Sequence, residues 1–233
     1  MSTLAPTPPI TSPRAVSTHG RDRRVGGIAA LAAAVTFIVG IVLAVTTLTD
    51  YTEGLDPAEA VQFVVGHQTT LFVWYLVVFL VFGVALVPLV RALRGVLRER
   101  APALADTAAI FGYVWVGLMF ASGMIANIGI QAVVDAGEHG ADHAATVWAA
   151  LDAVTNGLGG GNELVGGMWI LLVSVAALRA AALPRALAVT GMVTATAGLV
   201  TVVPGLSDVG MVFGLGSVVW FVWVGLALLR STR

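Results

Sequence analysis

The pattern of hydrophobic and polar positions divides the chain into long apolar runs separated by shorter polar segments. A helix rises 1.5 Å per residue, so about 20 apolar residues cross the roughly 30 Å hydrocarbon core of a bilayer. The pattern therefore predicts an all-α polytopic membrane protein, a six-transmembrane-helix bundle. The predicted spans cover about residues 25–48, 70–90, 107–132, 162–183, 185–204 and 208–229.

The polar segment 49–68 contains the signature of a short helix. Asp56 can cap its N-terminus, Pro57 suits the first turn, and Glu59 stands at the capping-box position. Valines three and four residues apart then follow on one face. We expect a short amphipathic helix that lies against the outer surface of the membrane.

The polar segment 133–160 predicts a second outer amphipathic helix over about residues 143–156, capped by Asp142. Asn156 and Gly157 are typical of a helix end. Its predicted apolar face consists of Val147, Trp148, Leu151 and Val154.

Residues 1–24 are rich in Pro, Ser and Thr and show no hydrophobic periodicity, which predicts a disordered cytoplasmic tail. The apolar run after it is longer than the core of a cleavable signal peptide, so we expect a retained first helix. Residues 25–230 then form one six-helix transmembrane domain.

Composition agrees with a membrane protein, because 58% of the residues are hydrophobic and only 11% are charged, against about 25% charged in soluble domains. The chain has no cysteine, which excludes disulfides, thiolate metal sites and cysteine nucleophiles. Its richness in Ala, Val and Gly suggests a bacterial genome of high GC content. We expect no cofactor and no nucleic-acid partner.

The positively and negatively charged residues are predicted mostly on opposite sides of the membrane. If the N-terminus is cytoplasmic and the chain crosses six times, all 12 basic residues, every one an arginine, fall on the cytoplasmic side. Ten of the 13 acidic residues fall on the outer side. The positive-inside rule therefore predicts a multi-pass protein of the bacterial inner membrane with both termini in the cytoplasm.

Several polar side chains are predicted at a common depth in the outer leaflet, where the third span ends and the fourth begins. Polar groups inside a membrane usually face the bundle interior or a wet cavity, so we expect a ligand pocket there. Its predicted walls are Asn127, Gln131, Asn162 and Glu163, with Asp152 and His67 near the rim.

Two simpler interpretations of these groups stay open. Asn127 and Gln131 can act as hydrogen-bonding glue between helices. Glu163 can cap the fourth span, where a carboxylate meets the positive end of the helix dipole. The glycine run 157–161 lacks the strand–loop–helix context and the lysine of a phosphate loop, so a flexible turn is its plainest interpretation.

Metal chemistry has weak support. His139 and His143 are four residues apart, and His67 is predicted on the same side of the membrane. Without a third anchored ligand this spacing is poor evidence for a metal site, and no catalytic residue stands out. A metal-dependent membrane enzyme is therefore only an alternative.

Four stretches together resemble a family of bacterial multi-spanning proteins catalogued only as a domain of unknown function. They are the start of the first span, LFVWYLVVFLVFGVALVPLV, NGLGGGNELVGGMW and ALPRALAVTGMVTATAGLVTVVP. The resemblance covers about residues 25–230. It implies an integral membrane protein of about six helices, with no activity to carry over.

These observations predict a membrane protein that binds or transports a small ligand, a lipid or a proton at the outer pocket. The expected partners are membrane lipids, a small-molecule ligand and a second copy of the chain. The main alternative is a non-catalytic structural or accessory subunit whose partner docks on a glycine-lined face such as Gly210–Gly214.

Overall fold

The structure, a computed structural model, describes residues 13–160, 163–203, 205–206 and 209–231. Every regular element in these residues is a helix, and they contain no strand. The helices are α1 (Pro13–Thr46), α2 (Thr49–Glu53), α3 (Pro57–Gly66), α4 (Gln68–Tyr75), the π-helix η1 (Leu76–Val81), α5 (Phe82–Arg98), α6 (Pro102–Gly137), α7 (Ala141–Thr155), the π-helix η2 (Asn156–Gly160), α8 (Glu163–Ala180), α9 (Arg185–Val200) and α10 (Gly210–Arg230).

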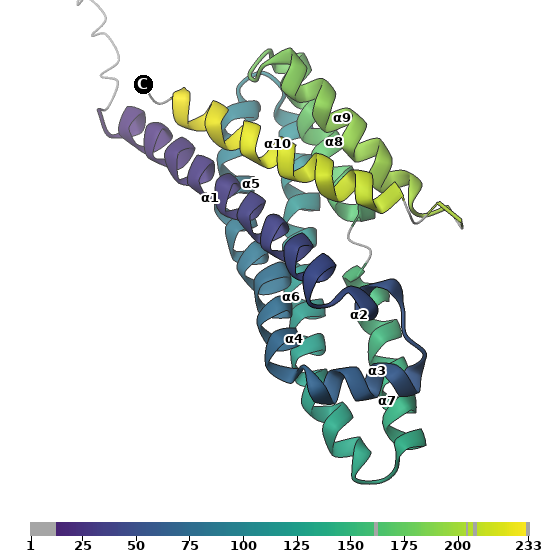
Figure 1. Ribbon diagram of the computed structural model, residues 1–233. Coiled ribbons are helices and arrows are strands. Elements are labelled where there is room, and N and C mark those ends of the chain that lie inside the picture. The colour runs from purple at the N-terminus through teal and green to yellow at the C-terminus, as the bar shows by residue number, and fades with distance from the viewer. Residues whose placement is uncertain (1–12, 161–162, 204, 207–208, 232–233) are drawn as a thin grey trace, which may run out of the picture.

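The helices form a bundle and a smaller lobe (Figure 1). The bundle contains α1, α5, α8, α9, α10 and the first part of α6, with α1 between α5 and α10, and α9 between α8 and α10. The lobe, called here the α3–α7 lobe, contains α2, α3, α7, the start of α4 and the end of α6. It has a small core of its own, made of Leu48, Val64, Leu71, Ile130 and Val133.

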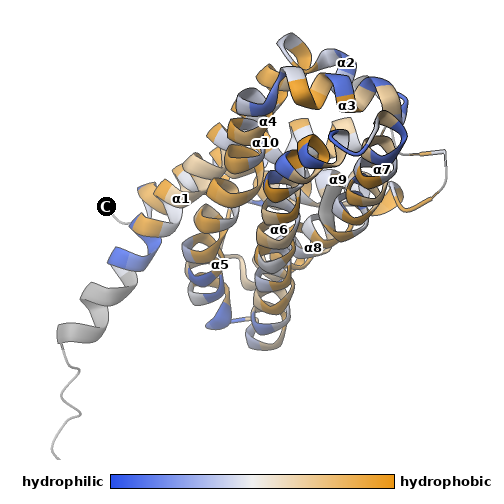
Figure 2. Ribbon diagram, turned by 90° about the horizontal axis from the view of Figure 1, so that it is seen from below, coloured by the Kyte–Doolittle hydropathy of each residue, from blue (hydrophilic) through white to orange (hydrophobic). Residues whose placement is uncertain are grey.

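At the side of the bundle opposite the lobe, arginine side chains connect the ends of neighbouring helices. We call this side the arginine end. Arg91 of α5 pairs with Asp22 of α1 at 2.6 Å, and Arg94 pairs with Asp106 of α6 at 2.7 Å. Arg100 donates to the carbonyl oxygen of Ala180 at the end of α8. Hydrophilic residues mark the α5–α6 turn in Figure 2, and the helices leading away from it are mostly hydrophobic.

Within the described residues, five helices are long and apolar enough to cross a membrane. They are residues 20–46, 68–98, 102–137, 141–180 and 210–230. The remaining predicted span corresponds to α9, which is apolar but has only 16 residues.

Several predicted helix boundaries are wrong. α1 begins at Pro13, inside the stretch predicted to be a disordered tail, while residues 1–12 lie outside the described part. α6 continues past the predicted end of the span at residue 132 to Gly137, since residues 132–136 contain neither glycine nor proline. α7 ends at Thr155 with Asn156 as its C-cap, close to the predicted end at residue 156, and the chain then continues as the π-helix η2.

The two short helices differ in how well their starts were predicted. The N-cap of α3 is confirmed, because the Asp56 carboxylate accepts from the backbone N–H groups of Ala58 and Glu59. The predicted Asp142 cap is wrong. Gly140 caps α7, its φ of +119° makes the tight turn from α6, and Asp142 stands in the first helical turn.

Tryptophans seated on glycines hold α6 and α8 together. Trp115 of α6 covers Gly166 of α8, and Trp169 of α8 covers Gly112 of α6. A Cβ atom added at Gly166 would lie 2.7 Å from Cζ2 of Trp115, and one at Gly112 would lie 2.7 Å from Nε1 of Trp169. Both indoles are buried, so each glycine is the space into which the opposite ring fits.

Replacing Gly112 by alanine is expected to destabilise the bundle. The new methyl group would meet the Trp169 indole and also Val90, which lies 2.6 Å from the added Cβ. Overpacking of this kind costs about 1–3 kcal/mol of unfolding free energy. Reversible unfolding in mixed micelles of SDS and a mild detergent measures the loss.

Gly117→Ala on the same helix is the matched control. A Cβ at Gly117 has no atom within 4 Å, so that variant should keep the wild-type unfolding free energy or gain slightly from helix propensity. Equal stability of the two variants would mean that the indoles do not depend on these glycines for space.

Candidate functional site

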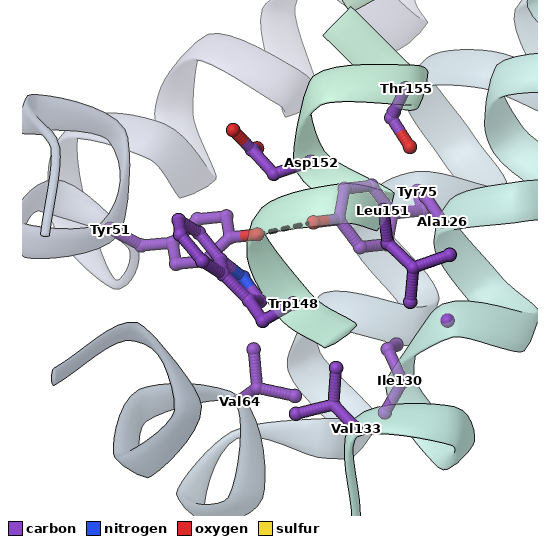
Figure 3. Close-up of a pocket in the computed structure, with 11 residues that line it drawn as sticks. Tyr51, Val64, Tyr75, Ala126, Ile130, Val133, Trp148, Leu151, Asp152 and Thr155 are labelled. Carbon is purple, nitrogen blue, oxygen red and sulfur yellow. Dashed lines mark hydrogen bonds between the residues drawn. The ribbon is translucent and has the colours of Figure 1, made fainter. Parts of the chain in front are cut away.

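A cavity in the α3–α7 lobe has a volume of about 420 Å³ and lies between α2, the α4–η1 junction and α7. Aromatic side chains and one carboxylate make most of its wall: Tyr51, Trp74, Tyr75, Phe79, Trp148 and Asp152. A narrower pocket of about 40 Å³ adjoins it and reaches toward Val64 and Val133 (Figure 3). We call the larger space the aromatic cavity.

Local structure explains how these side chains meet. Trp148 and Asp152 are four residues apart on α7, so they project from the same face of that helix. Tyr51 lies on α2, which ends at Gly54, where a φ of +100° turns the chain toward α3. Tyr75 ends α4 immediately before the π-helix η1.

The two tyrosines are hydrogen-bonded to each other. Their hydroxyl oxygens are 2.8 Å apart, and Figure 3 shows the bond across the cavity wall. Burial raises the pKa of the Tyr51 phenol above its usual value, so this group stays neutral at physiological pH and can donate or accept. The Tyr51 ring also stacks on Phe63 of α3, with 5.4 Å between the ring centroids.

Asp152 has no cationic partner among the described residues. Asn156, one turn further along the chain, donates from Nδ2 to Oδ2 at 3.0 Å. The ion pairs that the described residues form all lie at the arginine end of the molecule. A half-buried carboxylate therefore shares a cavity wall with five aromatic side chains and forms no ion pair among the described residues.

Glu163 lines a different cavity inside the bundle. This space, the inner cavity, has a volume of about 230 Å³ and is otherwise walled mainly by apolar groups such as Phe82, Met119 and Phe213. Gly210 of α10 stands against the carboxylate, because a Cβ there would lie 3.3 Å from Oε1 of Glu163.

The remaining predicted site residues lie elsewhere. Asn127 and Gln131 line a shallow depression between α4 and α6. Gln131 donates to Asp135 at 2.7 Å, while the buried Asn127 Oδ1 has no partner. His67 ends α3, where its Nδ1 is 3.0 Å from the Phe63 carbonyl oxygen. Asn162 lies outside the described residues.

The predicted pocket between Asn127, Gln131 and Glu163 is therefore not formed. The prediction placed the end of the third span level with the start of the fourth. Instead α6 runs on into the lobe and α7 returns along it, so Glu163 faces Met119. Asn127 is eight residues further along α6, about 12 Å away at 1.5 Å per residue.

The structure also bears on the two alternative functions, a metal-dependent enzyme and an accessory subunit. His139 and His143 are neighbours with ring centroids 6.0 Å apart, but His67 stacks on Phe63, and no group of three metal-ligating side chains forms among the described residues. Gly210 and Gly214, predicted as a docking face for a partner subunit, line the cavity that contains Glu163.

Sequence reasoning missed Tyr51 and Tyr75 and assigned Trp148 only to a helix face. The available signal was the pairing of Trp148 with Asp152 at i and i+4, which aims an aromatic ring and a carboxylate in one direction. The tyrosines are 24 residues apart on α2 and α4, and no local pattern joins them.

Comparison with known families now assigns the chain. Residues 25–230 match the family model described as "Domain of unknown function (DUF4386)". The chain belongs to this family. The DUF4386 match covers both the bundle and the lobe, so the two cavities lie within the family domain. No curated protein and no solved structure matches the chain.

The Tyr51–Tyr75 hydrogen bond should be measurable in a double-mutant cycle. Each Tyr→Phe change removes one hydroxyl and leaves the other without its partner, so each should lower the unfolding free energy by about 0.5–2 kcal/mol. The double variant should lose less than the sum of the single variants, with a coupling of about 0.5–1.5 kcal/mol.

Tyr113→Phe is the control for this cycle, because Tyr113 is 45% exposed on α6 and touches neither tyrosine of the pair. It should leave stability unchanged. Strictly additive losses in the double variant would show that the two hydroxyls do not interact.

Proposed function

We propose that the protein crosses the cytoplasmic membrane of a bacterium six times, with both termini inside and the α3–α7 lobe outside. The clustering of arginines at the end of the bundle away from the lobe supports this orientation. α9 is the sixth span, since it packs along α8 and against α10 although it is short. Its roughly 24 Å is accommodated by slight thinning of the bilayer.

Cysteine labelling tests the orientation and the number of spans, because the natural chain has no cysteine. In intact cells, a membrane-impermeant maleimide should label Glu138→Cys and Leu206→Cys, and should label Glu99→Cys only after lysis. All three positions are exposed. If α9 does not cross, Leu206→Cys will behave like Glu99→Cys.

The function that the geometry supports best is the binding of a small organic cation in the aromatic cavity. One observation carries it: five aromatic side chains surround a space of about 420 Å³ at which a carboxylate has no cationic partner. Quaternary and tertiary ammonium groups are recognised by such rings, each contributing about 0.5–2 kcal/mol. The volume lies in the range typical of small-molecule sites.

The aromatic rings and the carboxylate that line the aromatic cavity have separate roles in this proposal. The rings Trp74, Tyr75 and Trp148 present π faces to the alkyl groups around a charged nitrogen. Asp152 supplies the opposite charge, and Asn156 orients it through the bond to Oδ2. The Tyr51–Tyr75 bond holds α2 against the bundle and closes one side of the site.

Choline and its neutral isostere 3,3-dimethylbutan-1-ol form a matched pair of probes, because they differ chiefly in the charge on the central atom. The purified protein should bind choline at least 10-fold more tightly than the alcohol, as measured by isothermal titration calorimetry. Asp152→Asn should weaken choline binding at the aromatic cavity at least 10-fold, equivalent to about 1.4 kcal/mol, and leave binding of the alcohol unchanged.

Asp142→Asn serves as the control, since Asp142 is an exposed carboxylate on the same helix that lines none of the cavities described. It should bind choline like the wild type. Failure of the wild-type protein to distinguish choline from the alcohol would contradict a cation site.

A further inference from the structure

The inner cavity repeats the chemistry of the aromatic cavity deeper in the bundle. Its wall combines one carboxylate, that of Glu163, with the rings of Phe37, Trp74, Phe82 and Trp115. Side chains from α1, α4, η1, α5, α6, α8 and α10 converge there, so the space lies where the lobe joins the bundle.

Two side chains separate the cavities. Trp74 and Phe79 belong to the walls of both the aromatic cavity and the inner cavity. The Trp74 indole donates to the carbonyl oxygen of Gly40 on α1 at 3.2 Å, which holds the ring in this position. Phe79 lies in the π-helix η1, and single π-helical turns inside α-helices are frequent at functional sites.

Glu163 resembles Asp152 in its surroundings. It is half-buried, and no arginine pairs with it among the described residues. Glycines at positions 210 and 214 keep open the space beside the carboxylate, since any larger side chain there would project into the cavity. A carboxylate so placed among apolar side chains is stabilised most by a cation that brings its own hydrophobic surface.

We infer that the inner cavity is a second binding site for the same class of organic cation, with Glu163 as its counter-charge and Trp74 and Phe79 as the partition that the ligand passes. This inference rests on the proposed function of the aromatic cavity. The two carboxylates then mark successive positions on a path from the lobe toward the interior of the bundle.

Binding stoichiometry tests the second site directly. Equilibrium dialysis of the full-length protein in mild detergent with radiolabelled choline should give two equivalents bound per chain. Glu163→Gln and Asp152→Asn should each reduce this to one, and the double variant should bind none. Glu99→Gln, which changes an exposed acid at the arginine end, should keep both.

A second variant separates loss of the site from loss of the fold. A side chain at Gly214 has open space before it and would enter the inner cavity. Gly214→Leu should therefore fill the cavity without removing a charge. It should bind one equivalent of choline, and Asp152→Asn added to it should bind none.

The outcomes distinguish the two proposals. A wild type that binds one equivalent, lost in Asp152→Asn and kept in Glu163→Gln and Gly214→Leu, overturns the inner site and leaves the proposed function standing. One equivalent that is lost in Glu163→Gln and kept in Asp152→Asn supports the inner site and contradicts the aromatic cavity. No binding by the wild type overturns both.

Discussion

Two tryptophans pack reciprocally on two glycines between α6 and α8, and this packing determines much of the architecture. Lipid is as apolar as the side chains it surrounds, so helices in a bilayer associate through close packing rather than through the hydrophobic effect. Trp115 over Gly166 and Trp169 over Gly112 lock the two helices at one register and one separation. Phe221 of α10 and Phe82 of α5 extend the same ring cluster to the neighbouring helices.

That register sets where α8 begins along α6. With Trp169 set on Gly112, α8 begins at Glu163 near Met119 of α6, and the rest of α6 packs on α4, η1, α3 and α7. At 36 residues α6 is about 54 Å long, far more than the roughly 30 Å of a bilayer core. The excess length is covered instead by α7 and α3, which creates the lobe and the aromatic cavity at its junction with the bundle.

The sequence allowed the helical class, the family and most helix positions to be predicted, because these follow from hydropathy and from local signals such as the Asp56 cap. Asn127 and Glu163, predicted to share one pocket, line different cavities, because hydropathy does not say where along a long helix its neighbour begins. The aromatic cavity was not predicted either. Its walls come from α2, α4 and α7, and only tertiary packing brings Tyr51 against Tyr75.

The two cavities share one electrostatic feature, a carboxylate that forms no ion pair within the described part of the chain. The arginines whose pairing the structure describes compensate acids near the arginine end, as Arg94 does for Asp106. Asp152 and Glu163 lie away from that end, and no arginine pairs with either of them among the described residues. A carboxylate held among aromatic rings is stabilised when a positive charge arrives with its own apolar surface. Since Trp74 lines both cavities, a ligand bound near one carboxylate would lie next to the wall of the other cavity.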